Sequence, residues 1–324
     1  MQAQIIIPKW AKYIISDFTD YERNARKIDA KKINKLKFSL PDDVYFTYGF
    51  FDEHKKLRFD PNNPLKADTP NYPQLSAIIG PEYEEDKYYN PTAKAEGRVI
   101  RHKISSEYMQ ENRRIIIYTP ENYEDFDLAT IYVHDGVAYY RIAKLANMLE
   151  QILQENKIRP AHLVFVEPKN RLKEYGFNDN YQNFITKELI PFIDKELNTT
   201  SERITLGASL GGLVSATLAI KNPELFTTVI SQSGAFLGSP SQKKFHNVTD
   251  SWLLEEIKKT DDIPRWYTSV GTIEWLTDIN IEISKILSKK AKEHDFVQIN
   301  IGHNWVNWRN NLAKALEFAL RDGI

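Results

Sequence analysis

The chain has 324 residues, of which 42% are hydrophobic, and its formal net charge is −1. This composition is typical of a globular protein with a packed core and excludes a disordered chain. The near-neutral charge provides no bulk field for nucleic acid or an anionic membrane. The absence of cysteine excludes disulfides, thiolate zinc sites and a cysteine nucleophile. The length suits one large domain or two.

The N-terminus shows no targeting signal. It lacks the basic start and long apolar run of a signal peptide. No apolar stretch approaches the roughly 20 residues that are needed to span a bilayer. We therefore expect a cytoplasmic protein whose partners include neither membrane nor nucleic acid.

Residues 1–90 predict short strands separated by turns. β-branched or aromatic runs occur at residues 5–7, 13–15, 36–38 and 44–51, with turns rich in Pro, Asn and Asp between them. Several short strands without a long core helix favour a small β-sandwich. A polar helix is expected at residues 21–35. The polar segment 81–87 is expected to link this domain to a second one, residues 91–324.

From residue 97 onward, strands alternate with helices. We expect strands at residues 114–118, 130–133, 162–166, 204–206, 228–230, 267–270 and 296–301, and helices at residues 138–154, 181–197, 213–220, 279–292 and 308–320. Such alternation predicts an α/β domain, with a mostly parallel sheet and helices on both faces. Ligands of such sheets bind beyond the carboxyl ends of the strands.

A glycine-rich turn stands between a predicted strand and a predicted helix. Gly207-Ala208-Ser209-Leu210-Gly211 has the G-x-S-x-G pattern of a sharp, strained turn that exposes its serine as a nucleophile. Glycines at both ends avoid collisions that a Cβ would cause. The Leu210 N–H, at the helix N-terminus, would stabilise a developing oxyanion. The alternative is a glycine-rich turn with an incidental serine.

A nucleophilic serine needs a base, and the base needs an acid that orients it. On turns of this kind the acid and then the histidine follow the serine in the chain, each after a strand. Four of the seven histidines precede Ser209, and two later ones lie in polar or charged segments: His54, His102, His134, His162, His246 and His294. His303 directly follows strand 296–301 and is the predicted base. The alternative is a loop histidine that caps the last helix.

Two carboxylates compete for the role of the acid. Glu274 lies directly after strand 267–270, and Asp278 lies four residues further on. Glu274 could hold the imidazole tautomer and stabilise its charged form. The alternative role of Asp278 is to cap the following helix, and that of Glu274 is a surface carboxylate.

A second oxyanion donor is expected on the loop after an earlier strand. His134-Asp135-Gly136-Val137 follows strand 130–133, and Gly136 would let the chain turn so that the Val137 N–H points at the site. No H-E-x-x-H and no spaced set of His, Asp and Glu accompanies this segment, so we predict no catalytic metal.

Taken together, these motifs resemble a known family. The elbow, His134-Asp135-Gly136, Ser231-Gln232-Ser233-Gly234 and Gly302-His303 look like the esterase-D-type serine esterases, and within them most like the enterochelin (enterobactin) esterases and related ferric-siderophore hydrolases. The resemblance covers residues 98–320. Residues 1–90 are similar to the immunoglobulin-like N-terminal domain of those esterases through residues 41–51 and 60–64.

This resemblance implies an α/β-hydrolase fold preceded by a small immunoglobulin-like β-sandwich. It implies a nucleophile Ser209, a base His303 and an acid Glu274, with Leu210 and Val137 as oxyanion donors. Acyl transfer to water on these groups requires no cofactor, and a siderophore's iron would be cargo. After Ser233-Gly234 the siderophore enzymes usually carry large aromatics, whereas this chain departs from them with Ala235-Phe236-Leu237-Gly238.

The expected substrate is a small-molecule ester, namely the trilactone of a ferric catecholate siderophore. Arg171, Lys173, Trp305 and Arg309 would form a basic, aromatic pocket for it. For each arginine the alternative is a structural ion pair, Arg171 with Glu174 above all.

Two alternative functions remain open at this stage. One is a general carboxylesterase or an acetyl or feruloyl esterase of acylated sugars. The other is a carbohydrate-binding or scaffold protein with an idle hydrolase domain, whose sandwich would bind glycan through Trp10, Phe18, Tyr21 and Tyr45.

Overall fold

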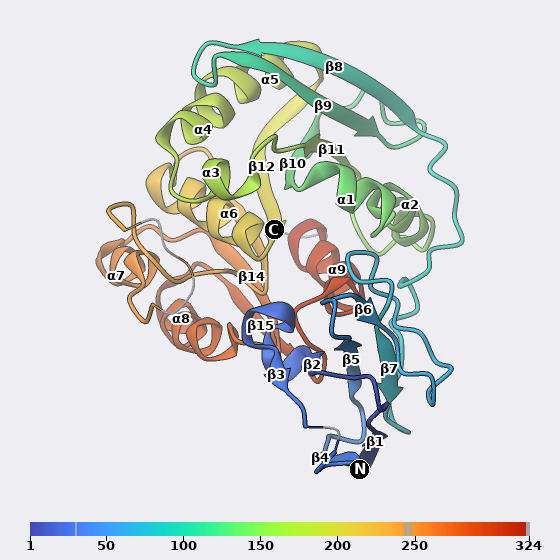
Figure 1. The fold of residues 1–324 in the computed structure, drawn as a ribbon. Coiled ribbons are helices and arrows are strands. Elements are labelled where there is room, and N and C mark those ends of the chain that lie inside the picture. The colour runs from blue at the N-terminus through green and yellow to red at the C-terminus, as the bar shows by residue number, and fades with distance from the viewer. Residues whose placement is uncertain (30, 243–244, 246–247, 322–324) are drawn as a thin grey trace. The chain divides into compact units, whose positions relative to one another are not determined.

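The computed structural model describes residues 1–29, 31–242, 245 and 248–321 (Figure 1). Their contacts divide the chain into two compact units. Unit 1 combines Met1–Asp86, Val270–Thr277 and Gln298–Asn310, and unit 2 combines Lys87–Ser269, Asp278–Val297 and Asn311–Ile324. Unit 1 thus contains two late segments besides the N-terminal strands. The division into domains 1–90 and 91–324 stays a prediction.

The N-terminal part of unit 1 consists of strands and single helical turns. Its elements are β1 (Gln2–Ile6), β2 (Tyr13–Ser16), η1 (Asp17–Thr19), η2 (Tyr21–Asn24), β3 (Arg26–Lys27), β4 (Lys35–Ser39), β5 (Tyr45–Phe51), β6 (Leu57–Arg58) and β7 (Ser76–Ile79). Within the described ranges, β1 pairs with β4, while β3, β2, β5 and β6 form a second sheet that β7 joins through β5.

The two sheets share one hydrophobic core. In β1, Ala3 and Ile5 are buried while their neighbours face solvent, which is the period-two pattern of a half-buried strand. They pack in one cluster with Phe46, Tyr48 and Phe50 of β5. The expected small β-sandwich therefore forms from the predicted strands.

The predicted helix at residues 21–35 is wrong. A single turn, η2, is followed by β3, whose Arg26 and Lys27 pair with β2. The segment has no apolar stripe that could hold a helix against the core. Its one buried aromatic, Tyr21, is 5% exposed and is fixed by hydrogen bonds instead.

The remaining strands form a second, larger sheet. They are β8 (Arg98–Ser106), β9 (Glu111–Thr119), β10 (Leu128–His134), β11 (Ala161–Val166), β12 (Thr199–Ala208), β13 (Thr228–Gln232), β14 (Arg265–Gly271) and β15 (His294–Ile299). Across the described residues their order is β15-β14-β13-β12-β10-β11-β9-β8. The pairs from β11 to β14 are parallel, and β9 and β8 add antiparallel strands at one edge. The predicted mostly parallel sheet is confirmed.

Helices alternate with these strands. They are α1 (Gly136–Arg141), α2 (Leu145–Gln154), α3 (Arg171–Tyr175), α4 (Asp179–Asn183), η3 (Phe184–Leu189), α5 (Ile190–Glu196), α6 (Leu210–Lys221), α7 (Trp252–Lys259), α8 (Thr277–Lys290) and α9 (Trp305–Leu320). Helix α1 lies against β11, whereas α6 lies against β12 and β13, and Figure 1 shows these two helices on opposite sides of the sheet. Helices therefore cover both faces, as expected.

Local chemistry explains where elements depart from the prediction. The helix expected at residues 138–154 divides into α1 and α2, because Lys144 adopts a left-handed φ of 50°. The helix expected at residues 181–197 contains the π-helical segment η3 just before Pro191. A proline cannot donate to the preceding turn, and a π-turn accommodates it.

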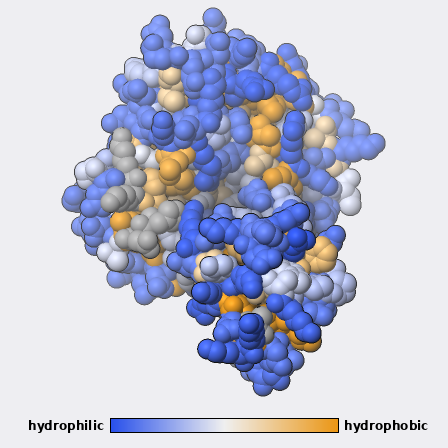
Figure 2. Space-filling model, in the orientation of Figure 1, coloured by the Kyte–Doolittle hydropathy of each residue, from blue (hydrophilic) through white to orange (hydrophobic). Residues whose placement is uncertain are grey.

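The visible surface is mostly hydrophilic, with apolar residues in small patches (Figure 2). In the part of the chain that the structure describes, no helix is long and apolar enough to cross a membrane.

Candidate active site

Ser209 occupies a strained turn between β12 and α6. Its backbone has φ 57° and ψ −121°, a conformation that costs a non-glycine residue roughly 1–3 kcal/mol. The turn is held by the Ser209 N–H, which donates to the Gln232 carbonyl at 2.9 Å, and by the Ala235 N–H, which donates to the Ser209 carbonyl at 3.0 Å. A Cβ on Gly207 would collide with the backbone of Gly211. The strand-to-helix elbow is therefore formed as the glycine spacing predicts.

The two predicted oxyanion donors lie in different surroundings. Leu210 is the first residue of α6, so its N–H is among those that have no partner within the helix. The Val137 N–H, in the first turn of α1, donates to Glu167 Oε2 at 2.9 Å. Burial raises the pKa of Glu167. The role of Val137 stays a prediction, and it requires that Glu167 release this N–H.

Arg171 joins two loops next to the nucleophile. Its guanidinium binds the Asp135 carboxylate through Nε and Nη2, each with a contact of 2.8 Å, and Nη2 also donates to the Ala208 carbonyl at 3.0 Å. The side chain is 38% exposed. The loop after β10 and the end of β12 are thereby tied together directly before Ser209.

The expected alternative pairing of Arg171 with Glu174 is wrong. Glu174 instead binds Arg113 of β9, with Nη2 and Oε2 2.6 Å apart and side-chain exposures of 0% for Arg113 and 5% for Glu174. Two backbone N–H groups, of Lys169 and Asn170, also donate to Glu174. Buried charge requires such pairing and hydrogen bonding, so Glu174 anchors the loop that presents Arg171. Lys173 is exposed.

Glu274 and His303 lie together in unit 1. His303 Nδ1 is 3.3 Å from Glu274 Oε1, and the two side chains are 15% and 0% exposed. The other carboxylate oxygen accepts from Asn307 Nδ2 at 3.3 Å. A carboxylate at Nδ1 favours the tautomer in which Nε2 can take a proton. Asp278, the competing acid, is exposed in the first turn of α8, where a helix dipole stabilises negative charge.

The loop that carries His303 is built on the N-terminal sandwich. Strand β15 ends at Ile299 and not at residue 301 as expected, because Ile301 forms a β-bridge with Tyr45 of β5. The Tyr45 N–H donates to the Asn300 carbonyl at 3.0 Å. The cap of α9 is Asn304, whose Oδ1 accepts from the N–H groups of Val306 and Asn307. Asn304, and not His303, therefore caps the last helix, and the His303 ring faces Glu274.

A buried carboxylate of the sandwich, Asp17, supports the same loop. Its oxygens accept from the hydroxyl of Tyr21 at 2.8 Å, from the N–H of Thr47 at 2.5 Å and from Asn304 Nδ2 at 3.2 Å. A Cβ on Gly302 would collide with this carboxylate. Asp17 therefore fixes the residues on both sides of His303. No motif around Asp17 indicates this role, because Thr47 and Asn304 come from distant parts of the chain.

Two predicted substrate-binding residues have structural contacts. Trp305 is 5% exposed and packs edge-to-face on Trp308, with ring centroids 4.9 Å apart. Arg309 binds Asp68 Oδ2 at 2.6 Å, and its side chain is 6% exposed. Their role in binding substrate stays a prediction that these contacts do not support. His303 contacts the rings of Trp275 and Trp308, with centroids 6.2 and 5.3 Å away.

Three other histidines are held neutral by burial. Desolvation lowers the pKa of His134 to about 3 and that of His294 to about 4, and it also lowers the pKa of His162. His294, which lies in a charged segment of the sequence, begins β15 and is half-buried. His246 lies outside the described residues.

Among the residues that the structure describes, no three His, Asp or Glu side chains are grouped as a metal site requires.

The family described as "Putative esterase" matches residues 106–319. The chain belongs to this esterase family. It is accordingly a hydrolase that acts on esters of small molecules.

Two curated relatives come from Bacillus subtilis (strain 168). Protein YjcH is 28% identical over 245 residues, which are 68% of this chain and 97% of that protein. Protein YbbA is 30% identical over 209 residues, which are 58% and 78%.

Solved structures show the same fold as this esterase. The enterobactin esterase FES from Shigella flexneri, in the presence of enterobactin, matches with TM-score 0.75 and 18% identity over 98% of this chain and 91% of that chain. Ferric enterobactin esterase from Salmonella typhimurium matches with TM-score 0.76 and 14% identity over 98% and 92%. A ferulic acid esterase matches with TM-score 0.60 and 17% identity over 69% and 97%. The predicted α/β-hydrolase fold with a preceding β-domain is confirmed.

The predicted site residues belong to both units. Glu274 and His303 form a pair in unit 1, while Ser209, Leu210 and Val137 lie in unit 2. Sequence reasoning missed Glu167 and Asp17. Glu167 directly follows β11, at the carboxyl edge where sites form, and that position was the available signal.

Replacing Asp17 with Asn should lower kcat for ester hydrolysis roughly tenfold or more, with little change in KM, because the His303 loop loses an acceptor and gains a competing donor.

Burial raises the pKa of Asp17 to about 6 from its usual 3.8. The folded protein thus binds this proton more tightly, so the stability that Asp17 contributes is present below about pH 4 and is lost as pH rises through 6. The stability advantage of the wild type over Asp17→Asn, from urea unfolding, should therefore shrink between pH 4.5 and 7.

Asp20→Asn is the matched control, since Asp20 lies in the same turn but binds the half-exposed Arg23. It should leave kcat unchanged. Wild-type kcat in Asp17→Asn would show that the His303 loop does not depend on this carboxylate.

Glu167→Gln should raise kcat/KM for a neutral aryl acetate by roughly tenfold, because a negative charge beside the Val137 N–H opposes a developing oxyanion. Stopped-flow or steady-state hydrolysis at pH 7.5 measures the change. The exposed Glu124→Gln removes the same charge elsewhere in unit 2 and should have no effect. A loss of activity in Glu167→Gln would instead mean that the enzyme needs this carboxylate charged.

Proposed function

We propose that this esterase is a serine hydrolase with Ser209 as nucleophile, His303 as base and Glu274 as acid. The observation that carries the proposal is the buried Glu274 carboxylate 3.3 Å from His303 Nδ1, on the loops that follow β14 and β15. A histidine so oriented needs a nucleophile, and the strained elbow at Ser209 offers one. The Ser–acid–His chain order agrees with this assignment.

In the proposed reaction, His303 Nε2 takes the hydroxyl proton as Ser209 Oγ attacks the ester carbonyl. Glu274 stabilises the imidazolium that forms. The Leu210 N–H, and the Val137 N–H once Glu167 has released it, bind the oxyanion, and the loss of such a donor costs about 3 kcal/mol in comparable sites. His303 then protonates the leaving alcohol. Finally it activates a water molecule that frees the acid from Ser209.

For the substrate we propose the ester backbone of a ferric catecholate siderophore. Support comes from the extent of the structural likeness. The enterobactin esterase structures cover 98% of this chain, including the N-terminal sandwich, whereas the ferulic acid esterase covers 69%. The iron would enter as part of the substrate. The likeness to a ferulic acid esterase keeps an acyl-sugar or general carboxylesterase as the alternative.

The proposal of a glycan-binding scaffold loses its main support. Tyr21 and Tyr45, two of the four aromatics expected to bind sugar, are only 5% and 4% exposed. Both form part of the contacts that hold the His303 loop. An idle domain would not need those contacts.

Glu274→Gln should lower kcat/KM for ester hydrolysis by about a hundredfold or more, since the amide no longer stabilises the imidazolium. Asp278→Asn is the matched control: the same loss of charge four residues on, at an exposed position, should cost less than about twofold. Initial rates with p-nitrophenyl acetate measure both. A larger cost for Asp278→Asn would identify Asp278 as the acid, and no cost for either would favour a Ser–His dyad.

The substrate proposal predicts a preference among three esters offered in competition: a ferric enterobactin-type trilactone, an acetylated xylo-oligosaccharide and p-nitrophenyl acetate. The trilactone should be preferred by about a hundredfold or more in kcat/KM, with the advantage falling as salt is raised. Ser209→Ala, checked for an unchanged melting temperature, should hydrolyse none of them. A preference for the sugar ester, or a flat profile, contradicts the siderophore substrate, whereas wild-type turnover by Ser209→Ala contradicts the nucleophile.

A further inference from the structure

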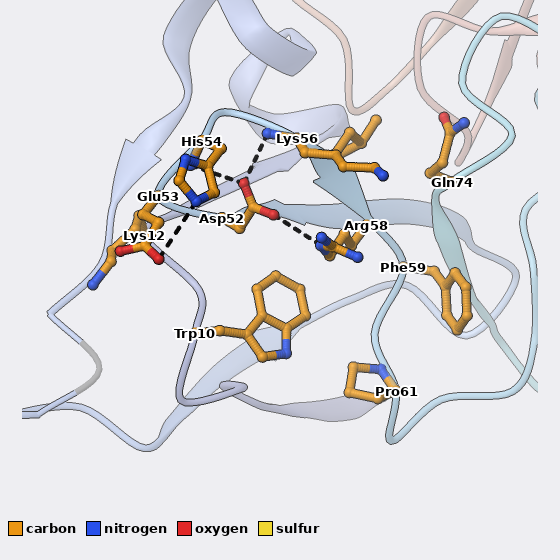
Figure 3. A pocket seen from close by; sticks show the side chains of 11 residues that line it. Trp10, Lys12, Asp52, Glu53, His54, Lys56, Arg58, Phe59, Pro61 and Gln74 are labelled. Carbon is orange, nitrogen blue, oxygen red and sulfur yellow. Dashed lines mark hydrogen bonds and ion pairs between the residues drawn. The ribbon is translucent and has the colours of Figure 1, made fainter.

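The N-terminal sandwich contains a pocket of about 680 Å³ beside its β5–β6 hairpin (Figure 3). Its walls come from the loop before β2, from the hairpin and from the segment after β6. None of its lining residues belongs to the elbow or to the loops that carry Glu274 and His303. The volume lies within the range of small-molecule sites. The pocket therefore has the size of a binding site outside the proposed catalytic machinery.

Two aromatic rings form apolar walls of this pocket. Trp10 is held in place by edge-to-face packing on Phe50, with ring centroids 6.1 Å apart and an interplanar angle of 89°. Phe59 is 43% exposed, and Figure 3 shows it across the space from Trp10. The ammonium of Lys66 lies 5.3 Å from the centroid of the Phe59 ring. Two aromatic walls suit a flat, apolar ring, because rings stack favourably in offset or edge-on geometry.

Two cations, Lys56 and Arg58, line the same pocket. The guanidinium carbon of Arg58 is 6.0 Å from the centroid of the Trp10 ring. Of the three guanidinium nitrogens of Arg58, Nε donates a hydrogen bond to Asp52 Oδ2 at 2.9 Å. The ammonium of Lys56 lies on the same side in Figure 3. Among the described residues we find no hydrogen bond from the terminal nitrogens of Arg58 or from Lys56 Nζ, so both groups can donate to a ligand.

Asp52, the carboxylate that pairs with Arg58, also accepts hydrogen bonds from the hairpin backbone. Asp52 Oδ1 accepts from the N–H groups of His54 and Lys56 at 3.0 and 2.9 Å, while Oδ2 binds Arg58 Nε. Its charge is thereby spread over three donors. Of the other charged residues that line the pocket, Lys12 and Lys56 are cations and Glu53 is a carboxylate, which lies 3.7 Å from His54 Nε2. With Arg58 and Asp52, the lining therefore holds three cations and two carboxylates. A carboxylate fits the guanidinium fork of Arg58 in a bidentate manner.

We propose that this pocket binds an aromatic carboxylate, with its ring between Trp10 and Phe59 and its carboxylate on Arg58 and Lys56. A neutral sugar could stack on Trp10 but would leave the two cations without a partner. A small aliphatic acid would pair with the cations but leave both rings exposed. A flat ring that carries a negative charge satisfies both features at once. This site is independent of the proposed hydrolytic function.

Isothermal titration of the full chain with salicylate tests the proposal. We expect saturable binding with Kd on the order of 1 mM, as suits a ligand of this size. Affinity should fall as salt is raised. Benzyl alcohol, which has a ring without charge, and acetate, which has charge without a ring, should each bind at least about tenfold more weakly.

Variants locate the binding. Arg58→Gln and, separately, Lys56→Gln should weaken salicylate about tenfold and about threefold. Lys37→Gln removes one charge from an exposed position of β4 and should leave the affinity for salicylate unchanged. Ser209→Ala, which should lose hydrolysis, should also keep this affinity. Since Lys56 Nζ donates no hydrogen bond among the residues that the structure describes, the Lys56 variant keeps the test valid if Arg58→Gln unfolds. The proposal is overturned by the absence of saturable binding up to about 20 mM, by equal affinity for benzyl alcohol, or by wild-type affinity in the Lys56 and Arg58 variants.

Discussion

The backbone at Ser209 is the constraint on which the centre of this esterase depends. A serine at φ 57° and ψ −121° is stable only when its surroundings determine that conformation. The end of β13 does so by accepting the Ser209 N–H through Gln232. Arg171 adds a second hold, since it binds the Ala208 carbonyl together with Asp135. The strained conformation of Ser209 therefore requires both small residues around the turn and a fixed ion pair beside it.

The second requirement is a fixed position for the histidine loop, and unit 1 meets it with the N-terminal sandwich. Ile301 leaves the large sheet to pair with Tyr45 of β5, and Asp17 approaches the backbone at Gly302 so closely that no side chain fits there. A buried carboxylate that accepts several hydrogen bonds is costly to desolvate but precise in direction. The sandwich therefore serves as a support for the His303–Glu274 pair, besides offering the separate pocket near Trp10.

Charged residues in the esterase are used mainly to hold loops. Arg113 and Glu174 form a buried pair, Arg309 pairs with Asp68, and Arg171 keeps about a third of its surface exposed while bound to Asp135. Removal of one partner from a buried pair leaves an uncompensated charge, so such arginines are poorly suited to bind an anionic substrate as well. Lys56 Nζ and the outer nitrogens of Arg58, which donate no hydrogen bond among the described residues, lie on the sandwich instead.

The sequence by itself determined what depends on local spacing. Glycines at 207 and 211 predicted the elbow at Ser209. Short β-branched, aromatic or apolar runs predicted the strands, and the chain order of Ser209, Glu274 and His303 assigned the triad candidates. It failed where the outcome depends on distant partners. The polar segment 21–35 contains a single turn and a short strand because Arg26 and Lys27 pair with β2. Arg171 forms its ion pair with Asp135 and not with Glu174, which is nearer in the sequence. Only the tertiary structure decided these contacts, and those of Asp17 and Glu167, because hydrogen bonds and buried charges are satisfied by whichever group the fold brings within reach.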